Sequence, residues 1–100
     1  CNCRNGILFT SVGIIYIKNR QWMIDFSPID PDPPSQVSHD YSKAYLRHLV
    51  ISGEILGSQI SSIHNLAFYM KLMREAREKI NEGNFRTWKE SMIKRVSGRL

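Results

Sequence analysis

Four prolines fall within seven residues near the end of the first third of this 100-residue chain. They are Pro28, Pro31, Pro33 and Pro34. Each proline fixes its own φ, removes a backbone N–H donor and disfavours helical geometry in the residue before it. We therefore expect a stiff, extended loop over residues 28–40, with a hairpin segment (1–27) before it and a helical part (41–100) after it.

The segment before the prolines has the pattern of a β-hairpin. Two runs of β-branched and aromatic residues, 7–10 and 14–17, are separated by Ser11, Val12 and Gly13. Such runs favour strands, and the glycine between them favours a turn. Residues 21–26, which follow the hairpin, are expected to be irregular or to form a short strand.

The first of three predicted helices begins soon after the prolines. Asp40 or Ser42 can cap its N-terminus, and it runs to about Ser52. Gly53 and Gly57 then bracket a short turn.

Two further helices complete the prediction. Ser61 or Ser62 caps the longest helix, whose apolar residues recur at helical spacing until Gly83, a natural C-terminal stop. Asn84 opens the last helix, and residues 97–100 are expected to fray. A hairpin followed by about three helices predicts a single α+β region.

The charge balance indicates the kind of partner. Fourteen lysines and arginines against nine acidic residues give a net charge of +5 and a pI of about 9.5. This surplus favours polyanions, of which a phosphate backbone is the commonest. No stretch approaches the roughly 18 consecutive apolar residues of a membrane span, so we expect no membrane partner.

The two cysteines, Cys1 and Cys3, bear on the cellular setting. In an extended chain, residues two apart point to opposite sides, which disfavours a disulfide between them. Without a cysteine framework, a reducing, cytoplasmic setting is predicted. Because the chain begins at a cysteine and not at a methionine, we expect it to be a piece of a longer protein.

Three blocks after the prolines carry a family resemblance. From Asp30 the chain reads Asp-Pro-Asp-Pro-Pro-Ser-Gln-Val-Ser-His-Asp-Tyr-Ser-Lys-Ala-Tyr-Leu-Arg-His-Leu, and Glu-Ile-Leu-Gly and Ile-His-Asn-Leu follow at 54–57 and 63–66. From residue 4 to about residue 94, the sequence closely resembles the C-terminal region of bacterial tRNA-guanine transglycosylases, also called queuine tRNA-ribosyltransferases. The resemblance implies the C-terminal part of a (β/α)8 TIM barrel with an inserted zinc subdomain.

The family's zinc ligands are largely replaced in this sequence. The family pattern Asp-Pro-Glu-Cys-x-Cys-x-x-Cys supplies three cysteines, which bind zinc together with the histidine of His-Asn. The matching positions here are Pro33, Ser35, Ser38 and His64. Proline has no donor atom and a serine hydroxyl stays protonated near neutral pH, so only His64 remains a good ligand. We therefore expect no stoichiometric zinc and predict no other cofactor.

Two alternatives remain for His64. It can join Asp30, Asp32, His39 and Asp40 in a weak, oxygen-rich metal site. The favoured interpretation is a partly buried histidine near a helix start, hydrogen-bonded to a loop carbonyl or carboxylate. In that case a contact other than zinc must hold the proline-rich loop to the long helix.

The resemblance also implies an RNA contact. The family carries Pro-Thr-Arg-x-x-Arg-Asn-Gly, and residues 4–6 match its last three positions, whereas its first arginine is absent. Arg4 and Asn5 should therefore contact the tRNA anticodon loop, and Lys18 and Arg20 extend the basic stretch. Arginine suits this role because its planar fork donates two parallel hydrogen bonds. The alternative is a solvated surface arginine.

A self-association face is predicted on the first helix. Tyr41, Tyr45 and His48 are spaced i, i+4 and i+7, which places them on one stripe. A second, aliphatic stripe on the same helix is expected to pack on the core: Leu46, Leu49 and Val50. Family members are homodimers, and an aromatic cluster at these positions belongs to their interface. The alternative is that both stripes lie in the core of a larger protein.

The implied activity is exchange of guanine at the tRNA wobble position for a 7-deazaguanine precursor of queuosine. In the family an aspartate attacks the ribose C1′, and a second aspartate assists proton transfer. The matching nucleophile falls before Cys1, so this piece alone is expected to be inactive. Asp25, Asp30 and Glu54 show no pairing typical of an acid–base dyad. Alternatives are a stand-alone basic RNA-binding module and a dimerisation piece without an RNA role.

Overall fold

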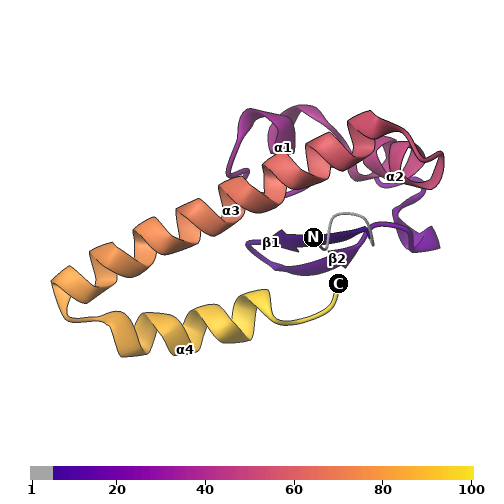
Figure 1. The fold of residues 1–100 in the computed structure, drawn as a ribbon. Helices are drawn as coiled ribbons and strands as arrows, with labels where there is room; N and C mark the ends of the chain where they lie inside the picture. Colours follow the sequence, from indigo (N-terminus) through magenta and orange to yellow (C-terminus); the bar gives the residue numbers. More distant parts are fainter. Residues whose placement is uncertain (1–5) are drawn as a thin grey trace.

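The computed structural model describes residues 6–100, in an elongated arrangement of 46 × 22 × 21 Å. Its elements are β1 (Ile7–Thr10), β2 (Gly13–Tyr16), the 3₁₀ helix η2 (Arg20–Trp22), α1 (Gln36–Asp40), α2 (Lys43–Ile51), α3 (Ile55–Glu82) and α4 (Phe85–Val96). Figure 1 shows the hairpin beneath the first half of α3, with α1 and α2 beside that same half. The predicted α+β class, a hairpin followed by helices, is confirmed.

The hairpin has the predicted position and a tight turn. β1 and β2 are antiparallel, with Ile7 opposite Tyr16 and Thr10 opposite Gly13, so Ser11 and Val12 form the two-residue loop. The Thr10 hydroxyl donates to the Gly13 carbonyl at 2.6 Å and helps to close the turn.

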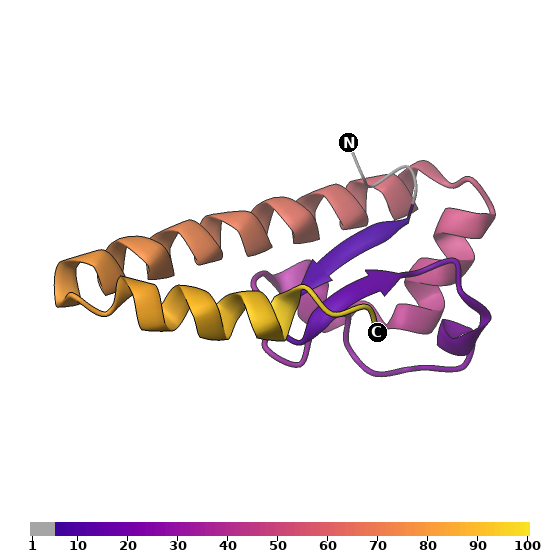
Figure 2. The ribbon, with the colours of Figure 1, turned by 90° about the horizontal axis from the view of Figure 1, so that it is seen from below.

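The C-terminal tail does not fray, contrary to the prediction. The Ile14 N–H donates to the Gly98 carbonyl at 2.8 Å, and the Leu100 N–H donates to the Ile14 carbonyl at 2.9 Å. Gly13 makes this approach possible, because a Cβ at that position would lie 2.6 Å from the Gly98 oxygen. The tail therefore pairs with the outer edge of β2, as Figure 2 shows from below.

The proline-rich stretch is not extended throughout, which corrects the predicted loop over residues 28–40. The five residues of α1 form a helical turn and a half immediately after Ser35. The last proline is Pro34, and one residue, Ser35, separates it from α1. The prolines therefore do not restrict the backbone within the helix itself. Within α1, Ser38 is fully buried and its carbonyl accepts from the Ile29 N–H at 3.1 Å.

Helix α2 begins where the Ser42 alternative placed it. The Ser42 hydroxyl accepts from the Tyr45 N–H at 3.1 Å, a side-chain N-cap. On the inner face, Leu46 and Leu49 are buried in the core, which confirms the predicted aliphatic stripe.

Helix α3 begins at Ile55 with Glu54 as its N-cap residue, well before the predicted caps Ser61 or Ser62. Gly57 lies inside the helix and does not break it. A Cβ on Gly57 would lie 3.0 Å from the Leu49 Cβ and from the Val50 nitrogen, so this glycine allows α2 and α3 to approach closely. Gly83 ends the helix with φ 79°, as predicted, and α4 follows Asn84.

The core lies at one end of the molecule. Its buried apolar side chains come from the hairpin and its flank, the loop before α1, α2 and the start of α3: Leu8, Ile15, Ile17, Ile29, Leu46, Leu49 and Ile60. The second half of α3 pairs with α4, which runs back alongside it in both views (Figures 1 and 2). None of the described helices is long and apolar enough to span a membrane.

Candidate functional site

His64 lies at the junction of three elements. Its side chain is fully buried within the first half of α3. Its Nε2 is 2.7 Å from the Phe9 carbonyl oxygen in β1, and its Nδ1 is 2.6 Å from the Ser38 hydroxyl in α1. His64 is hydrogen-bonded to a carbonyl, as the favoured interpretation expected, but that carbonyl belongs to a strand and the ring is completely buried.

Proton positions in this cluster follow from its acceptors. A carbonyl oxygen only accepts, so Nε2 carries the proton and donates to Phe9. In a neutral ring Nδ1 then accepts from the Ser38 hydroxyl. The Ser38 oxygen in turn accepts from the Ser35 hydroxyl, 3.1 Å away. We call this series of hydrogen bonds, from Ser35 through Ser38 and His64 to the Phe9 carbonyl, the serine–histidine relay.

The protonation of His64 is set by its burial. Removal from water lowers the pKa of His64 below its ordinary value of 6.5, because the charged imidazolium loses its hydration. The hydrogen bond to the Phe9 carbonyl and the negative charge of Asp30 oppose this shift without cancelling it. The ring is therefore uncharged at neutral pH, as the relay requires.

Asn65 extends the same contact along β1. Its side-chain oxygen accepts from the Phe9 N–H at 3.1 Å, and its side-chain nitrogen donates to the Ile7 carbonyl at 2.9 Å. The His-Asn pair thus satisfies the edge of β1 that faces away from β2. Sequence reasoning missed this role of Asn65, although its place beside His64 in the Ile-His-Asn-Leu block was the available signal.

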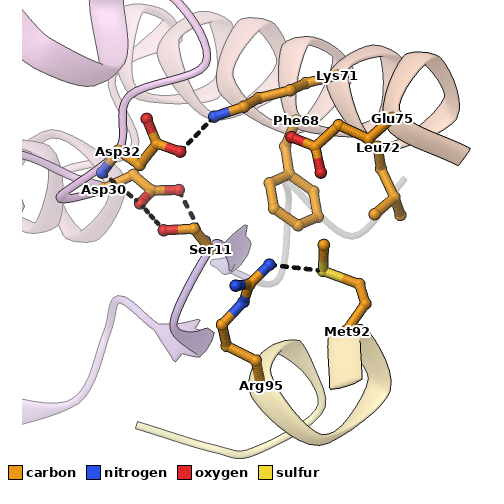
Figure 3. Close-up of a pocket in the computed structure, with 9 residues that line it drawn as sticks. All are labelled: Ser11, Asp30, Asp32, Phe68, Lys71, Leu72, Glu75, Met92 and Arg95. Atoms are coloured by element: carbon orange, nitrogen blue, oxygen red, sulfur yellow. Dashed lines mark hydrogen bonds and ion pairs between the residues drawn. The ribbon is translucent and has the colours of Figure 1, made fainter. Parts of the chain in front are cut away.

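Asp30 fixes the start of the proline-rich segment. Its buried carboxylate accepts from the Ser11 N–H at 2.8 Å, the Ser11 hydroxyl at 2.5 Å and the Asp32 N–H at 3.0 Å. Figure 3 shows Asp30 between Ser11 and Asp32, with Lys71 of α3 reaching Asp32 at 2.5 Å. The start of the loop is thereby tied to the hairpin turn through Asp30 and to α3 through Asp32.

The structure gives no support to the oxygen-rich metal site. Asp30 and Asp32 are engaged as described, while Asp40 accepts from Gln36 at 2.8 Å and lies 3.1 Å from His39. Within residues 6–100, no group of three or more His, Cys, Asp or Glu side chains is arranged to hold a metal ion.

A small cavity lies between the hairpin turn, α3 and α4 (Figure 3). Lys71 and Glu75 of α3 and Arg95 of α4 reach into it, and Arg95 donates to the Met92 sulfur at 3.3 Å. Its volume is about 30 Å³, which is room for one or two waters and too small for a nucleobase. This cavity is not a substrate site.

The predicted aromatic cluster is partly assembled. Tyr41 and Tyr45 stack with ring centroids 5.7 Å apart and an interplanar angle of 11°. Tyr41 precedes α2 in an extended conformation, so the three residues do not share one helical stripe as predicted. Tyr45 and His48 are exposed, and Tyr41 is half-buried.

An apolar groove adjoins this stack. Tyr41 forms part of its wall, together with Val37 of α1 and Leu56, Ile60 and Ile63 of α3. The groove is wide and open, with a volume of about 570 Å³. The Tyr41–Tyr45 stack and the groove therefore form one continuous surface, which we call the aromatic face.

The predicted RNA-contacting residues are only partly described. Arg4 and Asn5, like Cys1 and Cys3, lie outside the described residues. Lys18 and Arg20 are exposed directly after β2. The Lys18 side chain lies against Gly6, since a Cβ on Gly6 would be 3.3 Å from the Lys18 Cγ.

Two further arginines lie close to this basic stretch and were missed by sequence reasoning. Arg47 of α2 donates from Nε to the Asn19 carbonyl at 3.1 Å. The Arg99 guanidinium lies 4.4 Å from the centroid of the Tyr16 ring. No local motif marks either residue, because each comes from a distant part of the chain.

The carboxylates considered for catalysis have local roles. Asp25 accepts from the Ser27 N–H at 3.0 Å and from its hydroxyl, and the hydroxyl bond is the main cause that lowers the pKa of Asp25. Asp30 is bound to the hairpin turn. Among the described residues, neither carboxylate is hydrogen-bonded to the carboxyl group of another acid, so neither Asp25 nor Asp30 forms a dyad.

The described fold and site thus define a small α+β region whose histidine cluster organises structure and whose surface is basic. The family profile for queuine tRNA-ribosyltransferase matches residues 1–98. The chain belongs to this family, and it corresponds to a C-terminal portion of the enzyme.

Two relatives show the extent of the match. The chain is 43% identical, over 99 residues, to a queuine tRNA-ribosyltransferase of Aquifex aeolicus (strain VF5), covering 99% of this chain and 26% of the relative. It is 41% identical over 92 residues to the enzyme of Francisella tularensis subsp. novicida (strain U112), covering 92% of this chain and 25% of that relative. The chain therefore spans about a quarter of the length of these relatives.

Proposed function

We propose that this chain is the C-terminal part of a tRNA-guanine transglycosylase and that it supports tRNA binding and dimerisation. The parent enzyme would exchange guanine at the tRNA wobble position for a 7-deazaguanine precursor of queuosine. The observation that carries the proposal is the family match over residues 1–98. The chemistry belongs to the remaining three quarters of such an enzyme, because the residues described here assemble no nucleophile and base.

The tRNA contact is proposed at residues that precede β1 and at residues that follow β2 in the sequence. Arg4 and Asn5 would reach the anticodon loop, with Lys18 and Arg20 beside them. The packing of Lys18 against Gly6 supports this grouping, since Gly6 directly follows Asn5. Cations gathered in this way attract a phosphate backbone and release its counterions on binding.

The test is replacement of Arg4 by alanine in the full-length protein. We expect weaker tRNA binding and a salt dependence reduced by about one unit of slope, because one phosphate-directed cation is removed. Binding is measured by fluorescence anisotropy at several salt concentrations. Lys89→Ala on the exposed face of α4 is the matched control. Equal binding curves for Arg4→Ala and the wild type would contradict the contact.

Self-association is proposed through the aromatic face. The stacked pair of an exposed Tyr45 and a half-buried Tyr41, beside an apolar groove that shares Tyr41, has the composition of an interface centre. A second copy of the enzyme would cover this surface, and His48 would lie at its edge. The geometry differs from the predicted helical stripe, but Tyr41 and Tyr45 still act as one unit.

We propose that the chain is the C-terminal part of a (β/α)8 barrel with its inserted subdomain, and that the remainder of the enzyme packs against α3. The face of α3 opposite the core carries exposed apolar side chains along its whole length: Ile55, Leu66, Tyr69, Met70, Met73 and Ile80. Such a stripe needs a partner surface. A stand-alone module would leave it in water, so the stripe favours a region of a larger enzyme over an independent RNA-binding unit.

A further inference from the structure

The zinc site of the family and the residues of this chain disagree. Pro33 has no donor, Ser35 and Ser38 keep their hydroxyl protons, and both nitrogens of His64 are engaged in hydrogen bonds. We propose that the serine–histidine relay takes over the structural role of the metal, so that this region folds without zinc. The proposal concerns only the fold of the region and holds whether or not the proposed RNA contact is correct.

The first argument is convergence. Ser35, Ser38 and His64 occupy three of the four positions at which the family binds zinc, and here they lie in direct hydrogen-bond contact at 3.1 Å and 2.6 Å. These positions come from the end of the proline-rich loop, from α1 and from α3. The relay therefore joins the same segments that a shared metal ion would join.

The second argument is that no lone pair remains on His64 for a metal. Nε2 carries the proton that it donates to the Phe9 carbonyl, and the lone pair of Nδ1 accepts from Ser38. Zinc binding at Nδ1 would displace the buried Ser38 hydroxyl and leave it without this acceptor. A single imidazole and two protonated hydroxyls are not a donor set that offsets that loss.

The third argument is that the relay is supported on both sides. Asp30 fixes the loop before α1 through three hydrogen bonds, and Asn65 adds two more between α3 and β1. Ser38 itself has no solvent exposure, so its bonds to Ser35 and His64 are made where water does not compete. These contacts account for the attachment of the loop without any metal.

The test is thermal unfolding of the full-length protein with and without a strong zinc chelator, combined with metal analysis. We expect the same Tm in both conditions, no gain on addition of zinc, and far less than one zinc per chain. A chelator-induced fall in Tm that zinc reverses, or one zinc per chain after dialysis, would overturn the proposal.

A pair of serine variants tests the relay itself. Ser38→Ala should lower Tm by about 4–8 °C if the region unfolds as one unit of this size, because His64 loses its buried donor. Ser91→Ala, at an exposed position of α4 outside the relay, should leave Tm unchanged. Equal Tm values for the two variants would show that the relay contributes nothing.

A third variant tests the convergence of positions. With Pro33→Cys, Ser35→Cys and Ser38→Cys combined, His64 would complete a three-sulfur, one-nitrogen set typical of structural zinc. We expect this variant to bind one Co²⁺ or Zn²⁺ per chain and to become sensitive to chelators. A folded triple variant that binds neither ion would show that these positions do not converge, contradicting the structure on which the relay rests.

Discussion

At the scale of single residues, His64 illustrates how the partners of one side chain decide its role. A histidine beside a loop that contains serines is compatible with a metal ligand, a catalytic base or a buried hydrogen-bonding group. The structure distinguishes among these because both ring nitrogens have assigned partners, the Ser38 hydroxyl and the Phe9 carbonyl. The ring tautomer, and with it the direction of each hydrogen bond, follows from the carbonyl.

The lowered pKa of His64 predicts how stability changes with pH. The unfolded chain binds a proton at the ordinary pKa of 6.5, whereas the folded chain binds it only at lower pH. The stabilisation is therefore fully present above pH 6.5 and is lost as pH falls from 6.5 towards the folded value. The free energy of unfolding should fall by at most about 1.4 kcal/mol per pH unit in this window.

Urea denaturation at pH 7.5 and 5.5 measures this dependence. His64→Gln removes the titrating group, so its free energy of unfolding should change less between the two pH values than that of the wild type. His48→Gln is the matched control, because His48 is exposed. A His64→Gln variant with the same pH dependence as the wild type would show that His64 is not the responsible group.

At the scale of secondary-structure elements, neighbouring segments satisfy the edges of the hairpin. The His-Asn pair of α3 covers the outer edge of β1, and the C-terminal tail pairs with β2. A two-stranded hairpin is only marginally stable alone, so these contacts explain why it is ordered here. Elsewhere, the end of α1 places Tyr41 against Tyr45 of α2.

The aromatic face leads to a prediction about assembly. Tyr45→Ala in the full-length protein should shift the population from dimer towards monomer, since it removes half of the stacked pair at a surface proposed to be buried between copies. Native mass spectrometry or sedimentation at several protein concentrations measures the shift. Phe26→Ala, which removes an exposed aromatic side chain between η2 and α1, outside the aromatic face, is the control. An unchanged dimer fraction for Tyr45→Ala would count against this interface.

Most of the secondary-structure elements were predictable from sequence, and the incorrect predictions have identifiable causes. The hairpin, the Ser42 cap and the Gly83 stop follow from local residue preferences. The short helix α1 does not follow from them. Neither does the early start of α3, because a glycine typically favours a turn, whereas Gly57 lies within the helix in close contact with Leu49. Pairing of the tail with β2 depends on contacts more than eighty residues apart, which no local pattern encodes.

At the scale of the whole molecule, the distribution of apolar side chains agrees with a piece of a larger enzyme. The core is confined to the hairpin end, and the outward face of α3 remains apolar along its length. The relay and the buried Asp30 could not be predicted from sequence, since they depend on contacts across 19 to 55 residues. The family blocks, by contrast, were recognisable without any structural information.

We propose that this chain belongs to an active tRNA-guanine transglycosylase whose catalytic residues lie outside residues 1–100. The most direct measurement is incorporation of labelled guanine into tRNA by the full-length protein and, separately, by residues 1–100 alone. We predict incorporation by the full-length protein and none by the shorter chain. This proposal would be contradicted by a folded full-length protein that binds tRNA but incorporates no guanine. Incorporation by residues 1–100 alone would contradict it as well.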